Sequence, residues 1–375
     1  MIATLSCMAA NRNVLPNADT EQSAPEVLER LVHQAENAAA SDIHLQMLEG
    51  AASVSFRLDG VMIATTELPA DVADRVFGRI KFLAKLKTYQ DSMPQDGRIE
   101  RADLNARNDI RVATYPTVTG EKIVLRLFNN SSPKTFAELD FPADTTDALE
   151  KFLRQTSGLL LLTGPSGGGK TTTIYACLNF LAKAGGRHII TVEDPAEQII
   201  PGVMQTEVNE ARGLDFAKAA RHLLRQDPQV LVIGEIRDEE TANIAVRAAL
   251  TGHLVISTLH AGSCKGVFER LLVMCADYSM VASCVELVLN QRLVRKLCSE
   301  CSGKGCAACL QTGYRGRLPL AEWVRVNDVM RRRIAARELE GLDAVPSLDE
   351  RAQALMRAGL TNEPEIERVL GVARH

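Results

Sequence analysis

The segment 164–171 constrains the possible fold more than any other part of this chain. Its sequence, Gly-Pro-Ser-Gly-Gly-Gly-Lys-Thr, fits the pattern G-x-x-x-x-G-K-[ST]. Glycines in this pattern let successive backbone N–H groups turn inward around phosphate oxygens. An apolar run at 159–162 precedes the segment and a helical stretch at 171–181 follows it. Strand, loop and helix in this order predict a nucleotide-binding α/β domain; the alternative is a glycine-rich turn without a ligand.

Each residue of this phosphate loop has an expected role if the ligand is ATP. Lys170 would reach the β- and γ-phosphates, and the Thr171 hydroxyl would be a ligand of Mg²⁺. The backbone of the loop and the first turn of the helix would bind the phosphates. The predicted ATP-binding residues are Gly164, Pro165, Ser166, Gly167, Gly168, Gly169, Lys170, Thr171 and Thr172.

Further apolar runs at 189–192, 230–233 and 254–257 alternate with helical segments. Runs that are apolar on both faces are typical of buried parallel strands, so this half is predicted to be a doubly wound α/β sheet. The three runs lead into Glu193, Glu235 and His260, and ligands bind at the carboxyl ends of parallel strands. Glu235 is therefore a candidate magnesium group, or else a carboxylate that simply faces solvent. His260 is equally compatible with a γ-phosphate sensor and with a structural histidine.

The pattern changes along the chain predict two domains. Strand-like and helical stretches mix in the first part, and a polar segment with a proline at 129–133 separates it from the apolar runs. The resulting division is a flexible lead-in at 1–24, a smaller mixed α/β domain at 25–130, a linker at 131–145, and the nucleotide-binding domain at 146–375, with a metal module at 298–317 and C-terminal helices at 327–375.

Four of the nine cysteines lie within twelve residues, as two C-x2-C pairs: Cys298, Cys301, Cys306 and Cys309. Two such pairs supply four thiolates, enough for a closed tetrahedral site, and Gly303 and Gly305 allow the tight reversal between them. Zinc is the predicted metal, and iron or an iron–sulfur centre would use the same ligands. The scattered cysteines are interpreted as buried small hydrophobic residues in a reducing compartment.

Charge and hydropathy restrict the possible partners. The formal net charge of −4 argues against a general attraction to nucleic acid. The chain contains no apolar run near the roughly 20 residues of a membrane-spanning helix, and its first ten residues lack the features of a signal peptide. We therefore expect a cytoplasmic protein that contacts a membrane only through partners.

The chain resembles the ATPases that drive type II secretion and type IV pilus assembly. The resemblance covers about 24–373 and depends on short motifs in a fixed order. In the C-terminal half these are Thr-Val-Glu-Asp-Pro at 191–195, Leu-Arg-Gln-Asp-Pro at 224–228, Gly-Glu-Ile-Arg-Asp at 234–238, Thr-Gly-His at 251–253 and Thr-Leu-His at 258–260. In the N-terminal half they are Ala-Ser-Asp-Ile-His at 40–44, Pro-Gln-Asp-Gly-Arg at 94–98 and Gly-Glu-Lys-Ile-Val at 120–124.

The resemblance implies a RecA-like ATPase domain preceded by a PAS-like domain, assembled as a homo-hexamer with ATP between neighbouring subunits. Glu193 would orient or deprotonate the attacking water, and Glu235 would serve the magnesium. Arg98 and Arg111 would contact the γ-phosphate; the alternative is a surface salt bridge for each. The cysteine module, followed by Thr-Gly-Tyr-Arg-Gly-Arg at 312–317, favours assembly or secretion over retraction.

This sequence also departs from the family pattern. Ala-Gly-Ser follows His260 where relatives usually have Thr-Asn-Asp, and the loop between the cysteine pairs is short. Long family members dock on an inner-membrane platform protein through an extra N-terminal domain, for which only about 25 residues are available here. A conjugation-type DNA-transport ATPase is the alternative function. A scaffold without catalysis is disfavoured, because Lys170, Glu193 and Glu235 are all present.

Overall fold

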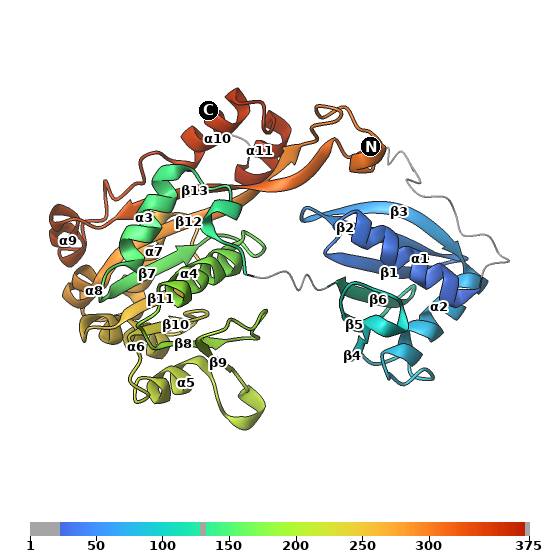
Figure 1. The fold of residues 1–375 in the computed structure, drawn as a ribbon, viewed down its shortest axis with the longest axis horizontal. Helices are drawn as coiled ribbons and strands as arrows, with labels where there is room; N and C mark the ends of the chain where they lie inside the picture. The colour runs from blue at the N-terminus through green and yellow to red at the C-terminus, as the bar shows by residue number, and fades with distance from the viewer. Residues whose placement is uncertain (1–22, 128–132, 372–375) are drawn as a thin grey trace, which may run out of the picture. The chain divides into compact units, whose positions relative to one another are not determined.

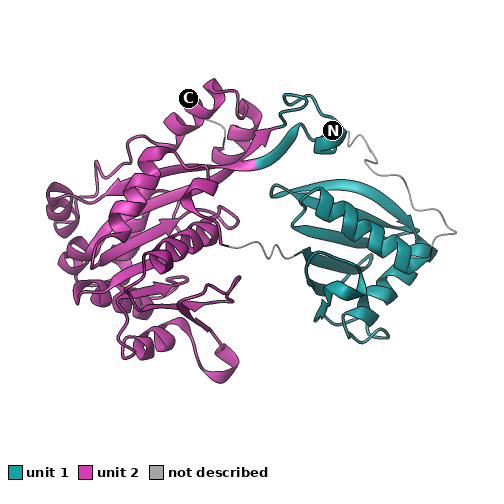
Figure 2. Cartoon of the chain, viewed as in Figure 1, with its two compact units in different colours: residues 1–130, 298–316 teal, residues 131–297, 317–375 magenta. Residues whose placement is uncertain are grey.

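The computed structural model describes residues 23–127 and 133–371. The chain divides into two compact units: residues 1–130 with 298–316, and residues 131–297 with 317–375 (Figure 2). Most of the expected lead-in and the first residues of the expected linker lie outside the described residues. Each unit has its own sheet and its own hydrophobic core.

The first unit is a six-stranded antiparallel sheet in the order β3-β2-β1-β6-β5-β4, with two helices packed on it (Figure 1). Side chains that alternate along the strands bury one face against the helices, as the period of two requires. The elements are α1 (Ala24–Asn37), β1 (Asp42–Leu48), β2 (Ala51–Leu58), β3 (Val61–Pro69), α2 (Ala70–Leu83), β4 (Gln95–Ile99), a 3₁₀ turn (Arg101–Asp103), β5 (Ile110–Thr117) and β6 (Gly120–Leu127).

The second unit is built on a seven-stranded sheet in the order β13-β12-β7-β11-β10-β8-β9, in which every neighbouring pair from β12 to β9 is parallel. Its first elements are α3 (Ala143–Leu153), β7 (Gly158–Thr163), α4 (Lys170–Ala184), β8 (Ile189–Glu193), β9 (Val203–Glu207), α5 (Phe216–Leu223), β10 (Val230–Ile233), α6 (Glu239–Leu250) and β11 (Leu254–Thr258). The later ones are α7 (Cys264–Met274), α8 (Tyr278–Cys284), β12 (Val285–Leu297), β13 (Tyr314–Arg325), α9 (Asp328–Ala335), α10 (Leu348–Arg357) and α11 (Glu363–Leu370).

Strand β7 shows why this sheet is covered on both faces. Leu159 and Leu161 belong to the core beneath α5, α6, α7 and α8, whereas Leu160 and Leu162 belong to the core beneath α3 and α4. All four leucine side chains are fully buried. A strand that alternates between two cores must be apolar throughout, which explains the run at 159–162. The predicted α/β class with a doubly wound, mainly parallel sheet is confirmed.

The four-cysteine segment differs from its expected assignment. It leaves the second unit's sheet after β12 and returns at β13, and a 3₁₀ turn (Ala307–Cys309) lies within it. The division into units nevertheless groups residues 298–316 with the first unit rather than with the ATPase sheet. Within that unit the Gly316 N–H donates to Asp59 Oδ2 at 2.8 Å, and Leu310 packs against the core. The segment is grouped with the first unit because of contacts with residues distant in the sequence, such as Asp59, and the order of residues along the chain does not predict such contacts.

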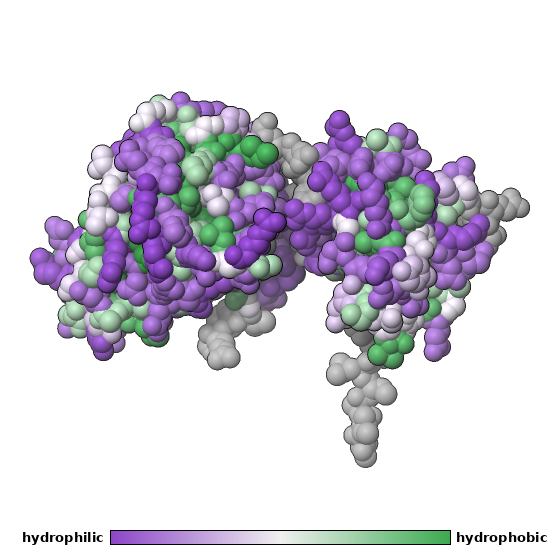
Figure 3. All heavy atoms as spheres, turned by 90° about the horizontal axis from the view of Figure 1, so that it is seen from below, coloured by the Kyte–Doolittle hydropathy of each residue, from purple (hydrophilic) through white to green (hydrophobic). Residues whose placement is uncertain are grey.

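The surface of the described residues is mainly hydrophilic. One face is drawn in Figure 3, where hydrophobic residues lie scattered among polar ones. Large exposed apolar side chains include Ile199 and Val273. Among the described residues, no helix is both long enough and apolar enough to cross a bilayer.

Candidate active site

The phosphate loop lies between the end of β7 and the start of α4, as its motif predicts. Gly164, Gly167 and Gly169 have φ values of 132°, 73° and 89°, which L-residues with a side chain rarely adopt. At Gly164 a Cβ atom would also lie 2.1 Å from the carbonyl oxygen of Gln291 on β12. Glycine is therefore required there both for the backbone angle and for the close approach of the neighbouring strand.

Lys170, the first residue of α4, folds back over the loop. Its Nζ donates to the carbonyl oxygens of Gly164 at 2.8 Å and Pro165 at 2.9 Å. Burial lowers the pKa of Lys170, and the nearby charge of Glu235 partly opposes that shift. The ammonium group is thus held where the loop backbone curves, in reach of an anion that the loop would enclose.

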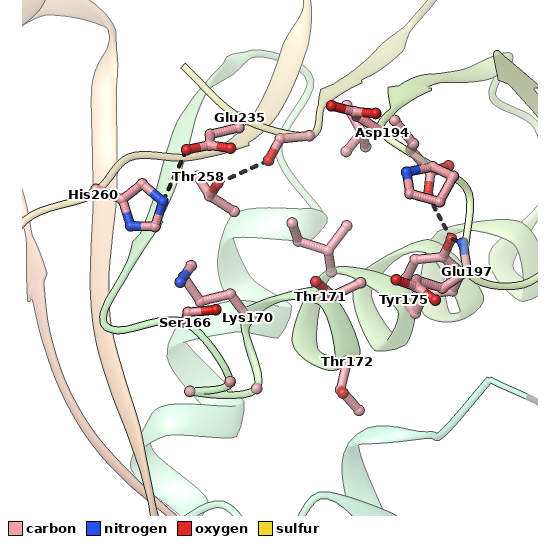
Figure 4. A pocket seen from close by; sticks show the side chains of 18 of the residues that line it. Ser166, Lys170, Thr171, Thr172, Tyr175, Asp194, Glu197, Glu235, Thr258 and His260 are labelled. Carbon is pink, nitrogen blue, oxygen red and sulfur yellow. Dashed lines mark hydrogen bonds and ion pairs between the residues drawn. The ribbon is translucent and has the colours of Figure 1, made fainter. Parts of the chain in front are cut away.

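A cavity of about 500 Å³ opens beside the loop (Figure 4). It is formed entirely by the second unit, and both strand-end carboxylates reach it. The predicted site residues that line it are Ser166, Gly167, Gly168, Gly169, Lys170, Thr171, Thr172, Glu193, Glu235 and His260. Gly164 and Pro165 do not line the cavity. Their backbone carbonyl groups accept the hydrogen bonds that hold Lys170.

Glu235 and His260 meet at the ends of adjacent parallel strands, β10 and β11. His260 Nε2 lies 2.9 Å from Glu235 Oε1 (Figure 4), and Arg237 Nε donates to the other carboxylate oxygen at 2.9 Å. The same Arg237 also reaches Asp194 Oδ2 at 3.5 Å. Because β10 and β11 are paired in register, residues some 25 positions apart come together at one edge.

Glu193, at the end of β8, is 7 % exposed and accepts three side-chain hydrogen bonds. The donors are Thr191 Oγ1 at 2.6 Å, Gln205 Nε2 at 2.9 Å and Tyr175 Oη at 2.5 Å. A buried carboxylate needs such partners, since an unsatisfied buried charge is strongly destabilising. These bonds fix the carboxylate at the wall of the cavity.

Arg98 and Arg111 belong to the first unit and do not line the cavity. They occupy directly opposed positions on β4 and β5, so their side chains project from the same face of the sheet. The Arg98 guanidinium forms an ion pair with Asp109, and its side chain is 67 % exposed. The structure therefore brings the two arginines together, on a different unit from the phosphate loop.

The four predicted metal-ligating cysteines converge. Their Sγ atoms all lie within 4.8 Å of one another, with separations of 3.9 Å for Cys298–Cys306, 3.8 Å for Cys301–Cys309 and 3.7 Å for Cys306–Cys309. Tetrahedral zinc with Zn–S bonds of about 2.3 Å requires S–S separations of about 3.8 Å. Backbone N–H groups of Gly305 and Gly313 point to two of the sulfur atoms, each at 3.3 Å. The donor set fits a zinc ion.

The remaining described cysteines are buried: Cys177, Cys264, Cys275 and Cys284. Burial raises the pKa of the Cys177 thiol to about 12, which suppresses the reactive thiolate. They behave as small hydrophobic residues of the core. Cys7 lies outside the described residues.

Sequence reasoning missed four residues that support the site: Tyr175 and Arg317, which line the cavity, and Gln205 and Gln291. Tyr175 stands four residues after Thr171, a spacing that places both on one helix face, and this signal could have been used. Gln291 is a buried glutamine on β12 and accepts a hydrogen bond from Thr173 at 2.7 Å. Gln205 carried no signal, because its role depends on the pairing of β9 with β8.

A phosphate loop at the edge of a doubly wound sheet, with strand-end carboxylates beside it, defines a P-loop nucleotide hydrolase. The family model described as "Type II/IV secretion system protein" matches residues 17–368. The chain belongs to this family, and it is an ATP-hydrolysing enzyme.

Individual relatives agree with the family assignment. The chain is 40 % identical to "Protein transport protein HofB homolog" of Haemophilus influenzae, over 94 % of this chain and 75 % of the relative. It is 36 % identical to "Type II secretion system ATPase E" of Vibrio cholerae, over 94 % and 76 %.

Solved structures show the same fold. The pilus retraction motor PilT with bound ADP is 26 % identical and has a TM-score of 0.65, covering 91 % of this chain and 96 % of its own. The Legionella pneumophila ATPase DotB has a TM-score of 0.75 at 21 % identity, covering 96 % and 100 %, and supports the fold alone.

Proposed function

We propose that this chain is the subunit of a homo-hexameric cytoplasmic motor that hydrolyses ATP to power type IV pilus assembly or type II protein secretion. The observation that carries the proposal is the cavity, where Lys170, Glu193 and Glu235 meet beside the phosphate loop in a chain of this family. An inner-membrane platform protein is the proposed docking partner, and contact with the membrane is made through it.

We assign each residue at the cavity a separate role in ATP hydrolysis. The loop and first helical turn, Gly164 to Thr172, hold the phosphates, with Lys170 at the β- and γ-phosphates. Thr171 and Glu235 offer the oxygen ligands that Mg²⁺ prefers, and Mg²⁺ bound with ATP neutralises phosphate charge. Glu193 orients or deprotonates the attacking water. His260, half exposed beside Glu235, senses the γ-phosphate.

Arg98 and Arg111 are proposed to contact the γ-phosphate of ATP held by a neighbouring subunit. Their shared sheet face and the exposure of Arg98 support this role, because both guanidinium groups can serve one anion. Asp109 holds Arg98 until a phosphate replaces it. Hydrolysis then removes the anion that joins two subunits, which converts chemistry into relative movement.

Mixed hexamers test the shared site directly. Lys170→Ala and Arg98→Ala subunits are each expected to be inactive or nearly so alone. Mixed in one ring, an Arg98→Ala subunit keeps a working phosphate loop and a Lys170→Ala neighbour supplies Arg98, so turnover should return to at least about tenfold above either parent. Native mass measurement verifies mixing. Rings that mix without regaining turnover would contradict the shared site.

The alternative is a conjugation-type DNA-transport ATPase. Its distinguishing property would be turnover that rises when DNA is added, with a strong dependence on salt. The formal net charge of −4 favours the pilus or secretion function. We expect the wild-type hexamer to hydrolyse ATP at the same rate with and without DNA, and stimulation by DNA would favour the alternative.

We further propose that Cys298, Cys301, Cys306 and Cys309 hold a structural zinc ion. We expect about one zinc per chain by elemental analysis of freshly purified protein. Changing Cys298 and Cys301 to serine should remove the metal and lower the unfolding midpoint by at least about 3 °C, because structural zinc contributes directly to folding.

The matched control for this prediction is Ala308→Ser, which adds a hydroxyl at an exposed position between two of the cysteines. It should retain the zinc and the wild-type midpoint. Iron in place of zinc, or a protein without metal that unfolds at the same temperature as wild type, would contradict the assignment.

A further inference from the structure

Tyr175 joins three segments around the cavity through a single hydroxyl group. It lies on α4, one turn after Thr171, and its residue is 4 % exposed. Its Oη donates to Glu193 Oε2 at 2.5 Å and accepts from the backbone N–H groups of Glu197 at 2.9 Å and Gln198 at 3.3 Å. The hydroxyl thus connects the phosphate-loop helix to the end of β8 and to the segment that follows.

The direction of these hydrogen bonds is fixed by chemistry. Backbone N–H groups can only donate, so Tyr175 Oη accepts from them and keeps its own proton for Glu193. Burial and the negative charge of Glu193 both raise the pKa of Tyr175, so the phenol remains protonated across the range in which the enzyme works. Tyr175 is therefore a permanent donor to the carboxylate.

The carboxylate of Glu193 has about four acceptor positions. Tyr175 occupies one on Oε2, and Thr191 and Gln205 bind Oε1. Since the side chain lines the cavity, the acceptor position left on Oε2 is the one available to a water molecule. Without the Tyr175 bond only the two hydrogen bonds to Oε1 restrain the carboxylate, so its orientation about the terminal torsion, which has broad minima, is held less tightly.

We propose that Tyr175 is a positioning residue for ATP hydrolysis, whose hydroxyl holds Glu193 Oε2 in the orientation that receives the attacking water. This inference rests on the proposed role of Glu193. It also links binding to chemistry, because Thr171 and Tyr175 share one face of the same helix.

Tyr175→Phe in the full-length chain tests the inference, since it keeps the buried ring and removes only the hydroxyl. We expect kcat to fall by about tenfold, the scale of a lost orientation at the reacting group. The KM for ATP and the affinity for a fluorescent ADP analogue should stay within about twofold of wild type, because the phosphate contacts are unchanged. Thr191→Val, which removes the hydroxyl donor to Glu193 Oε1, should also lower kcat.

Two comparisons separate positioning from a structural role. Tyr278→Phe removes a hydroxyl that contacts Arg337 in the same unit, away from the cavity, and should leave kcat unchanged. In a Glu193→Gln background, Tyr175→Phe should cause no further loss, because the two residues act as one unit. Loss of nucleotide affinity in parallel with kcat, an unchanged kcat, or an increased kcat would each overturn the inference. Normal turnover of Glu193→Gln alone would instead overturn the proposed role of Glu193.

Discussion

Replacing Lys170 by alanine is expected to reduce ATP turnover by at least about 10³-fold, to the background of the assay. Lys170 is the only lysine among the described residues that line the cavity. Its ammonium group donates to the loop backbone at Gly164. Two arginines also line the cavity: Arg237, which is held by Glu235 and Asp194, and Arg317 on β13. Because Lys170 Nζ is held at the loop carbonyls of Gly164 and Pro165, we expect neither arginine to replace its charge at the β- and γ-phosphates.

Phosphate release by the purified protein measures this effect. Lys183→Ala provides the control, since Lys183 is exposed at the far end of the same helix and should leave turnover unchanged. In a strain that lacks the gene, the Lys170→Ala protein should fail to restore pili or secretion. Turnover above about a tenth of the wild-type rate would show that the lysine is not the group that stabilises the transferred phosphate.

Replacing Glu193 by glutamine is expected to slow hydrolysis by at least about 10²-fold while ATP still binds. The amide cannot take a proton from water, yet it has nearly the same shape. The Thr191 hydroxyl can accept a hydrogen bond from the amide nitrogen, while Tyr175 continues to donate to the amide oxygen. The variant should therefore fold normally and fail in the chemical step.

Single-turnover hydrolysis, together with binding of a fluorescent ADP analogue, separates these steps. The matched control is Glu269→Gln, at an exposed position on α7, which should hydrolyse ATP at the wild-type rate. Turnover of Glu193→Gln within about twofold of wild type would remove Glu193 from the chemistry and leave Glu235 as the candidate.

Local sequence patterns determined the phosphate loop, the buried strands and the cysteine cluster. The loop motif depends on glycine angles and on one strand and one helix that are adjacent in the chain. The largely apolar runs at 159–162, 189–192, 230–233 and 254–257 became β7, β8, β10 and β11, because a strand buried on both faces has no solvent-facing position. Their two polar residues, Thr191 and Ser257, are buried and donate hydrogen bonds to Glu193 and to the Ile233 carbonyl. The cysteine pairs are likewise local, so their spacing alone indicated that the sulfur atoms meet.

Only the tertiary structure decided which distant residues complete the site. Gln205 reaches Glu193 because β9 pairs with β8, and Gln291 closes against Gly164 because β12 pairs with β7. In the first unit, Arg98 and Arg111 share a face only through the register of β4 and β5, and Asp59 contacts Gly316 across more than half of the chain. Strand order and register are set by the packing of whole elements rather than by neighbouring residues, so no local pattern encodes these contacts.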